Sequence, residues 1–214
     1  MNQISDNDIH EIVTRVVRKT LGVDVPDAGN LPAATLPQTQ ATIQPTQNKP
    51  LPSVSEKPAR KVVAIGTDHG GVALKALLVQ ELDGLGYEAL DCGTNSTDPV
   101  DYPDIAHAVA SLVAEGKAWR GVIIDGAGIG SCMAANKIPG IRAALCYDYA
   151  TAVNSREHND ANVLTLGAGL IGNNLAKQIL STWLSTEFAG GRHAGRVDKI
   201  IALEKKYLKD RKTE

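Results

Sequence analysis

The sequence has little net charge, few cysteines and no long apolar run. Its 22 basic and 24 acidic side chains leave a formal net charge of −2, which argues against a nucleic-acid-binding protein. Its apolar runs fall far short of the ~20 residues that a membrane-spanning helix requires. The first residues are acidic where a secretory signal would be basic and then apolar. We therefore expect a soluble, cytoplasmic protein that binds neither nucleic acid nor membranes.

The cysteines give no sign of a disulfide framework or a metal centre. Cys92, Cys132 and Cys146 are odd in number, and no pair has the C-x-x-C spacing of zinc and redox sites. Reduced thiols in a cytosolic protein are the simplest interpretation. The sequence predicts no bound metal.

An uneven composition sets the expected domain boundary. Residues 1–60 hold seven of the ten prolines, only two of the twenty glycines and no aromatic residue. Such a segment cannot build a core of its own. Within it, residues 23–60 are rich in Pro, Thr, Gln and Ala, which predicts an extended, poorly ordered linker. We expect the folded domain to occupy residues 61–214.

Residues 1–22 have the pattern of a short amphipathic helix. Its apolar positions recur at helical spacing, at Ile9, Ile12, Val13, Val16, Val17 and Leu21. This stripe could dock on the chain's own domain or pair with copies of itself. It also resembles the encapsulation peptides that direct enzymes into bacterial microcompartments, which implies a shell protein as the partner of residues 5–22. A membrane-surface helix fits less well, because Trp, Phe and a strongly basic face are missing.

From residue 61 onward, short β-branched runs alternate with helical patterns. This alternation is typical of βαβ units and predicts a doubly wound α/β fold with five parallel strands. The expected strands are 62–66, 88–91, 121–125, 141–145 and 162–166. The expected helices are 71–85, 103–115, 131–137, 149–157, 172–186 and 197–208. Ligands of such sheets bind beyond the carboxyl ends of the strands.

The first and third of these strands end in motifs that suit a sugar phosphate. Asp68 and His69, in the run Gly66-Thr67-Asp68-His69-Gly70-Gly71, can hold a hydroxyl and a phosphate oxygen, although Asp68 could merely cap the next helix. The third strand ends at Asp125, followed by a loop with three glycines in five positions whose N–H groups can hold an anion. The loop residues are Gly126, Ala127, Gly128, Ile129 and Gly130.

Asp125 is the candidate general base. A carboxylate at the mouth of this loop can take a proton from a substrate carbon, and the loop N–H groups can stabilise the enediolate that forms. From residue type alone, a purely structural hydrogen bond to the loop is the stronger alternative. The loop is neither a Walker loop nor a dinucleotide fingerprint, because the required glycine and lysine spacing is absent.

Two further motifs supply an imidazole and two guanidinium groups. His158, in Ser155-Arg156-Glu157-His158-Asn159-Asp160, is the natural proton shuttle near neutral pH. Arg192 and Arg196 lie four residues apart, so both could face one phosphate. An exposed basic face is the ordinary alternative for such a pair.

Taken together, these motifs resemble the type B ribose-5-phosphate isomerases, which group with the galactose-6-phosphate isomerase subunits. The resemblance covers about residues 61–209. It is carried by Gly-Thr-Asp-His-Gly-Gly, Asp101-Tyr102-Pro103, the glycine loop running into Ala134-Ala135-Asn136-Lys137, Gly140-Ile141-Arg142-Ala143, Ser-Arg-Glu-His-Asn-Asp and Gly-Gly-Arg-His.

The resemblance implies a Rossmann-like αβα sandwich and an aldose-ketose isomerase of carbohydrate metabolism, in the pentose phosphate pathway. Such an enzyme would interconvert ribose 5-phosphate and ribulose 5-phosphate without metal or organic cofactor. It would form a homodimer or homotetramer with shared active sites. Asp68 and His69 would bind the sugar phosphate, residues 126–130 the enediolate, and Asn159 the substrate. His158 would open the sugar ring. Arg192 and Arg196 would reach the phosphate from the partner chain.

The sequence departs from the family pattern at several positions. Asp125 stands where many members carry a cysteine base, and Ser131 where another branch has glutamate; Cys132 is the second candidate for the base. Ala127 replaces a hydroxyl residue, and Gly169 an arginine that contacts the phosphate. The alternatives are therefore an isomerase of a tetrose, deoxy-sugar or hexose phosphate, or a catalytically weak sugar-phosphate-binding protein.

Overall fold

The computed structural model describes residues 61–208. The helix expected at 1–22 and the linker expected at 23–60 lie outside the described residues. Within the part described, no helix is long and apolar enough to cross a membrane.

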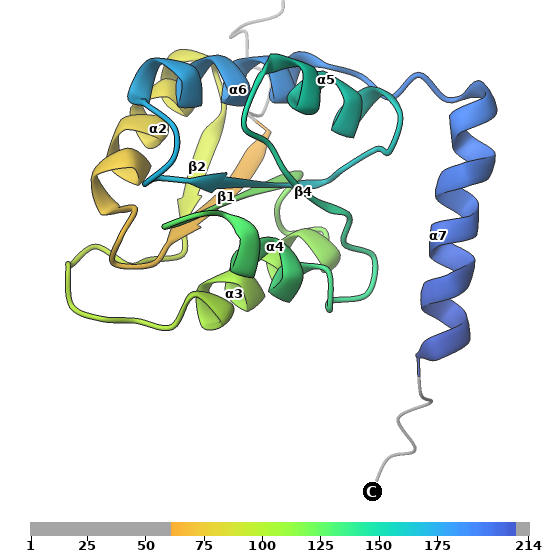
Figure 1. The fold of residues 1–214 in the computed structure, drawn as a ribbon, viewed down its shortest axis with the longest axis horizontal. Helices are drawn as coiled ribbons and strands as arrows, with labels where there is room; N and C mark the ends of the chain where they lie inside the picture. The colour runs from red at the N-terminus through yellow and green to blue at the C-terminus, as the bar shows by residue number, and fades with distance from the viewer. Residues whose placement is uncertain (1–60, 209–214) are drawn as a thin grey trace, which may run out of the picture. The chain divides into compact units, whose positions relative to one another are not determined.

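Five parallel strands form one sheet in the order β2-β1-β3-β5-β4 (Figure 1). All five were expected from the sequence, and the predicted parallel sheet is confirmed. Their bounds are β1 Val62–Thr67, β2 Glu88–Asp91, β3 Arg120–Asp125, β4 Ala143–Leu145 and β5 Val163–Gly167. The central strands β3 and β5 are buried along their whole length. Their runs of Val, Ile and Leu are typical of strands that are covered on both faces of the sheet.

Helices cover both faces of the sheet (Figure 1). Helices α2, α5 and α6 pack on one face around Trp183, and α3 and α4 pack on the other around Val109 and Ile123. Their bounds are α2 Val72–Gly84, α3 Tyr102–Ala114, α4 Ile129–Ala135, α5 Tyr149–Glu157 and α6 Asn173–Ser185. The start of α5 is fixed by a capping box, in which Asp148 accepts from the Thr151 N–H at 2.7 Å.

The strand order reverses between β1 and β3, which is the position at which open α/β sheets form a ligand-binding crevice. From β1 the chain passes to β2 at one edge, whereas from β3 it passes towards β4 at the other edge. Such a reversal leaves space beyond the carboxyl ends of the two strands, where ligands of open α/β sheets bind. Thr67 pairs with Ile124, so the residues that follow, Asp68 and Asp125, are neighbours at this position.

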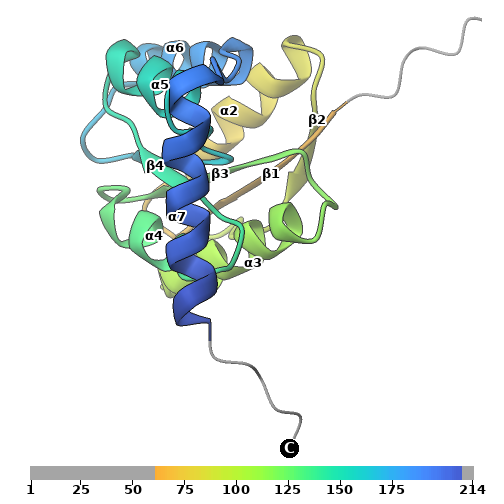
Figure 2. The same cartoon turned by 90° about the vertical axis from the view of Figure 1, so that its right-hand side faces the viewer.

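The last helix, α7 (Ala194–Tyr207), runs along the side of the domain next to β4 rather than over a face of the sheet (Figure 2). It begins three residues earlier than expected, because a 3-10 turn, η1 (Gly191–His193), leads directly into it. Arg192 therefore lies in the turn and only Arg196 in the helix. The side chain of Glu204 ties α7 to the domain by accepting from the Gly140 N–H at 2.9 Å.

Only Val197 of α7 is a buried hydrophobic residue, whereas Ile200, Leu203 and Tyr207 are 47, 58 and 73% exposed. The apolar side of this helix is thus largely uncovered by the rest of residues 61–208.

Candidate active site

Asp125 is buried at the end of β3, and its carboxylate is held by the loop that follows. Oδ1 accepts from the N–H of Ala127 at 2.8 Å and from the N–H of Gly128. Oδ2 accepts from the N–H of Ser131 at 3.0 Å. These bonds fix the orientation of the carboxylate and leave one lone pair of Oδ2 for another partner. Asp125 therefore does make the structural hydrogen bonds to the loop that the sequence suggested, and Oδ2 can still accept a proton.

The loop glycines allow this tight arrangement. Gly128 has φ +76°, a conformation that L side chains rarely adopt, and a Cβ there would come within 2.5 Å of Leu145. A Cβ on Gly130 would meet the ring of Tyr102 at 2.5 Å. At Gly126, by contrast, a Cβ would meet no described atom within 4 Å. The loop is packed on its Gly128 and Gly130 sides and open at Gly126.

Asp68 and His69 lie beside this loop. A Cβ on Gly70 would come within 4.0 Å of the Gly126 nitrogen, which shows how closely the two loops approach. The Asp68 carboxylate is mostly buried and accepts from the Gly70 N–H at 2.9 Å, so it shapes its own loop and does not cap α2. His69 is exposed, and its Nδ1 accepts from the Val100 N–H at 3.4 Å.

His158 ends α5 and is oriented by two asparagines. Asn159 Nδ2 donates to Asn154 Oδ1 at 3.3 Å, so the Nδ2 of Asn154 points to His158 Nδ1, 2.8 Å away. In the neutral imidazole, Nδ1 then accepts this bond and the proton resides on Nε2. Asn154 and Asn159 also line a cavity of about 430 Å³ beside α5.

His193 stacks on His158. The two imidazole planes are parallel to within 2°, with ring centroids 4.1 Å apart. Arg192 Nε donates to His193 Nε2 at 3.3 Å, and Arg196 follows one helical turn later. Neither arginine pairs with a carboxylate of residues 61–208. This group therefore offers an imidazole and two uncompensated cations to an anionic ligand.

The environment of His193 predicts a pH dependence of stability. Burial, and then the neighbouring His158, Arg192 and Arg196, lower the pKa of His193 below its ordinary value of 6.5, while Glu157 acts in the opposite sense. The unfolded chain therefore binds this proton more readily than the folded chain, so stability is lost as the pH falls through 6.5 towards the folded pKa.

In urea titrations between pH 8 and pH 5, His193→Phe should keep the stacked ring and lose part of the acid destabilisation seen in the wild type. Equal pH dependence in both proteins would contradict this assignment.

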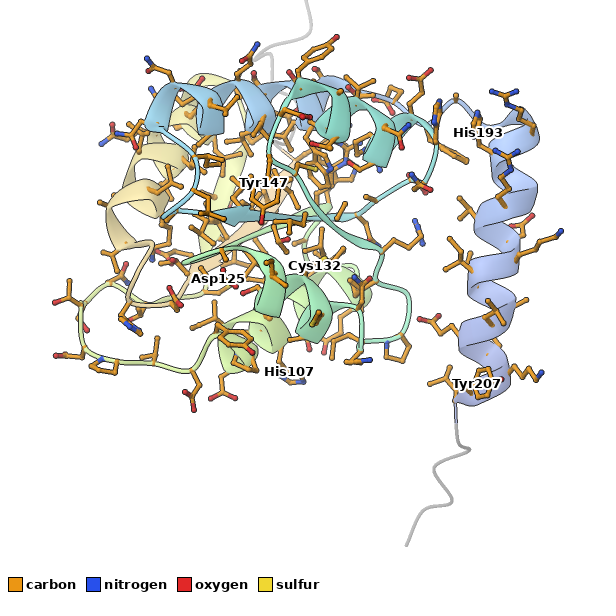
Figure 3. The ribbon with its side chains drawn as sticks, viewed as in Figure 1. His107, Asp125, Cys132, Tyr147, His193 and Tyr207 are labelled. Carbon is orange, nitrogen blue, oxygen red and sulfur yellow. The ribbon has the colours of Figure 1, made fainter. Side chains whose placement is uncertain are left out.

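The predicted site residues thus form two groups. Asp68, His69, Asp125 and the glycine loop lie together at the ends of β1 and β3, whereas His158, Asn159, Arg192 and Arg196 lie together near the start of α7. In Figure 3, Asp125 of the first group lies in the body of the domain, whereas His193, which stacks on His158 of the second group, lies at the top of α7. No hydrogen bond or ion pair within residues 61–208 joins them. A single chain therefore does not assemble all the predicted residues into one site.

Four residues of the site region were missed from the sequence. Tyr102 covers the loop at Gly130, and the Tyr147 hydroxyl donates to the Ala127 carbonyl at 2.8 Å. Asn154 and His193 orient His158. His193 directly follows Arg192, and Tyr102 lies in the motif Asp101-Tyr102-Pro103, so the sequence around both residues already indicates the site. Tyr147 and Asn154 carried none.

Cys132, the second candidate for the base, lies on α4 next to β4. Its Sγ donates to the Ala143 carbonyl at 3.4 Å, and the side-chain amide of Asn136 lies 3.6 Å away. Burial raises the pKa of this thiol above its usual value of 9.0, so the protonated form dominates near neutral pH. This state disfavours Cys132 as a proton acceptor.

No group of three or more His, Cys, Asp and Glu side chains within residues 61–208 is arranged to hold a metal ion. The expectation of a reaction without metal or organic cofactor stays a prediction.

Known proteins resemble this chain in fold and sequence over most of the described domain. The model of the ribose/galactose isomerase family matches residues 63–200. Ribose-5-phosphate isomerase B of Escherichia coli is 44% identical over 146 residues, which cover 68% of this chain and 98% of that protein. A D-erythrulose-4-phosphate isomerase of Pectobacterium atrosepticum is 42% identical over 140 residues, covering 64% and 91%.

Among solved structures, ribose-5-phosphate isomerase B of Clostridium thermocellum is 51% identical with a TM-score of 0.68, covering 69% of this chain and 99% of that one. The match therefore extends over nearly the full length of these relatives and includes both groups of site residues. The chain belongs to the ribose/galactose isomerase family and is a sugar-phosphate isomerase.

Proposed function

We propose that this enzyme interconverts ribose 5-phosphate and ribulose 5-phosphate. The observation that carries the proposal is the content of the two groups of polar residues. One group offers a carboxylate and loop N–H groups for the sugar, and the other offers an imidazole and two arginines for ring opening and the phosphate. Two relatives named for this substrate are 44 and 51% identical to this chain over the matched residues. The keto and aldehyde forms differ only in the position of two protons, so the reaction needs a base, an oxyanion site and a means of opening the ring.

In the proposed mechanism, Asp125 is the base. After ring opening assisted by His158, Asp125 Oδ2 takes the proton from C2. The electron pair forms a C1–C2 double bond, and the aldehyde oxygen becomes the oxyanion. The proton then returns to C1 while the O2 proton moves to O1, which leaves a ketone at C2. The N–H groups of Ile129 and Gly130, in the first turn of α4, have no intrahelical acceptor. They are therefore available to donate hydrogen bonds to this oxyanion.

The phosphate would be held by the second group. Arg192 and Arg196 are exposed, and they have no carboxylate partner within residues 61–208. Because these residues lie apart from Asp125 in one chain, we propose that a second copy of the chain supplies them. The exposed apolar side of α7, at Ile200, Leu203 and Tyr207, is the surface that such a copy would cover. A dimer or tetramer with shared active sites would result.

A relative with 42% identity is named for a tetrulose phosphate, which makes a smaller substrate the main alternative. Gly169 carries no side chain to contact a phosphate; its N–H donates to the Gly126 carbonyl at 3.0 Å, and a Cβ would lie 3.0 Å from the same oxygen. Residue 169 therefore supports the loop.

The test is an assay of ribose 5-phosphate, erythrulose 4-phosphate, a deoxypentose phosphate that keeps its 2-hydroxyl, and hexose 6-phosphates, with each conversion monitored by NMR in D₂O. We expect the highest kcat/KM with ribose 5-phosphate and deuterium incorporation at the carbon that is reprotonated. Preference for erythrulose 4-phosphate would keep the chemistry and replace the substrate. Binding without conversion of any sugar would favour the weak-catalyst alternative.

We also propose that residues 5–22 target the enzyme to a protein shell, as the resemblance of this segment to encapsulation peptides implies. These residues lie outside the described part of the chain, so the support is the sequence pattern alone. Residues 1–22 fused to a fluorescent protein should be captured by a co-expressed microcompartment shell. Diffuse fluorescence beside intact shells would contradict the targeting role.

A further inference from the structure

We propose that Tyr147 is a positioning residue for Asp125 and acts through the peptide group between Ala127 and Gly128. This inference rests on the proposed function, because it assumes that Asp125 is the base. Tyr147 lies two residues beyond β4 in the chain, and β5 separates β4 from β3 in the sheet. Figure 3 shows its side chain in the body of the domain, as it does that of Asp125.

Both ends of one peptide group are held. The Tyr147 hydroxyl donates to the Ala127 carbonyl oxygen at 2.8 Å. The N–H on the other side of the same peptide, that of Gly128, donates to Asp125 Oδ1. A continuous path of hydrogen bonds therefore runs from the phenol through a single peptide to the carboxylate. Polarisation of the carbonyl by the phenol strengthens the N–H as a donor at the other end.

This peptide needs such a restraint. Gly128 has φ +76°, and a glycine passes between positive and negative φ at little cost. A rotation of the Ala127–Gly128 peptide would turn its N–H away from Asp125 and release Oδ1. The Gly126 carbonyl, by contrast, is held by the backbone N–H of Gly169. Of the hydrogen bonds to loop carbonyls within residues 61–208, the bond from Tyr147 is the one that a side-chain substitution can remove cleanly.

The ring of Tyr147 also packs against the core on the α2, α5 and α6 face, so truncation to alanine would disturb the fold. Removal of the hydroxyl alone isolates the proposed role. The matched control is Tyr149→Phe, since Tyr149 lies two positions away, is 57% exposed and has no place in the proposed machinery.

Tyr147→Phe should lower kcat about three- to tenfold, the effect of one neutral hydrogen bond, with KM changed less than about twofold. Tyr149→Phe should match the wild type. In an Asp125→Asn background, Tyr147→Phe should cause no further loss, because the group that it positions is already gone. Unchanged kcat, or a full additional loss in that background, would overturn the proposal.

An activity-independent measurement separates this proposal from the proposed function. Hydrogen exchange of the Gly128 amide should be faster in Tyr147→Phe than in the wild type and unchanged in Tyr149→Phe. If the wild type converts no sugar phosphate, the proposed function and the base role fail together, whatever the exchange rates show. If it does convert one and the Gly128 amide exchanges equally in all three proteins, Tyr147 does not hold the peptide and this inference alone is wrong.

Discussion

Two nearly inactive variants, Asp125→Asn and His158→Ala, are expected to regain activity when their subunits are exchanged. Each should lose ~10²-fold or more in turnover, the usual contribution of a positioned acid or base. If Asp125 and His158 of different chains form one site, a mixed dimer holds one intact site and one doubly damaged site. With random exchange, half of the dimers are mixed, so activity should return to about a quarter of the wild-type value.

The matched control combines two variants that damage the same group. Asp125 and His69 both lie at the carboxyl ends of β1 and β3, so Asp125→Asn mixed with His69→Ala leaves no intact site in any dimer. This mixture should show no recovery and should keep the average activity of the two variants. Mass spectrometry of isotope-labelled subunits would report the exchange itself. Complete exchange without recovery in the first mixture would contradict the shared site.

The second large effect concerns an ion pair beside the site in which only the lysine is buried. The Lys75 ammonium, on a side chain that is 3% exposed, lies 2.6 and 2.7 Å from the two carboxylate oxygens of Asp91 and 2.7 Å from Asn95 Oδ1. Asp91 is 39% exposed and also accepts from the Gly93 N–H at 2.8 Å. The two partners are thus unequal, because only the carboxylate has access to water.

Asp91→Ala should therefore lower the free energy of unfolding by about 3–5 kcal/mol, since it leaves a buried ammonium without its counter-charge. The thermal midpoint would fall by about 10 °C in a domain of this size. Lys75→Met should cost less, because the exposed carboxylate is rehydrated. The double variant should be more stable than Asp91→Ala alone. Calorimetry of the four proteins checks this order, and a double variant no more stable than Asp91→Ala would refute it.

Most of the fold could be predicted because the apolar pattern and the local turn residues agree. The differences arise where a side chain or a glycine replaces a regular backbone bond. Strand β4 begins at Ala143 and not at residue 141, since the Arg142 N–H donates to the Asn162 side chain at 2.8 Å. Helix α4 begins at Ile129 and not at residue 131, because Gly128 turns the chain with its positive φ.

The candidate site was only partly predictable, because some of its contacts depend on single side chains that are distant in the sequence. Asp68, His69 and the glycine loop follow strands that the pattern predicts, so their proximity could be expected. The Tyr147 hydroxyl bond to Ala127 spans 20 residues and depends on how β4 and β5 are ordered in the sheet. The separation of His158 from Asp125 likewise follows from the position of α5 and η1, which local sequence does not encode.

The most direct test of this account is steady-state turnover of ribose 5-phosphate by the wild type beside Asp125→Asn, which keeps the shape of the side chain and removes the base. We predict an active wild type and a variant slower by ~10²-fold or more. Equal rates would contradict the role of Asp125 and direct attention to Cys132. An inactive wild type would contradict the assigned substrate, and the same pair of proteins would then be assayed with erythrulose 4-phosphate.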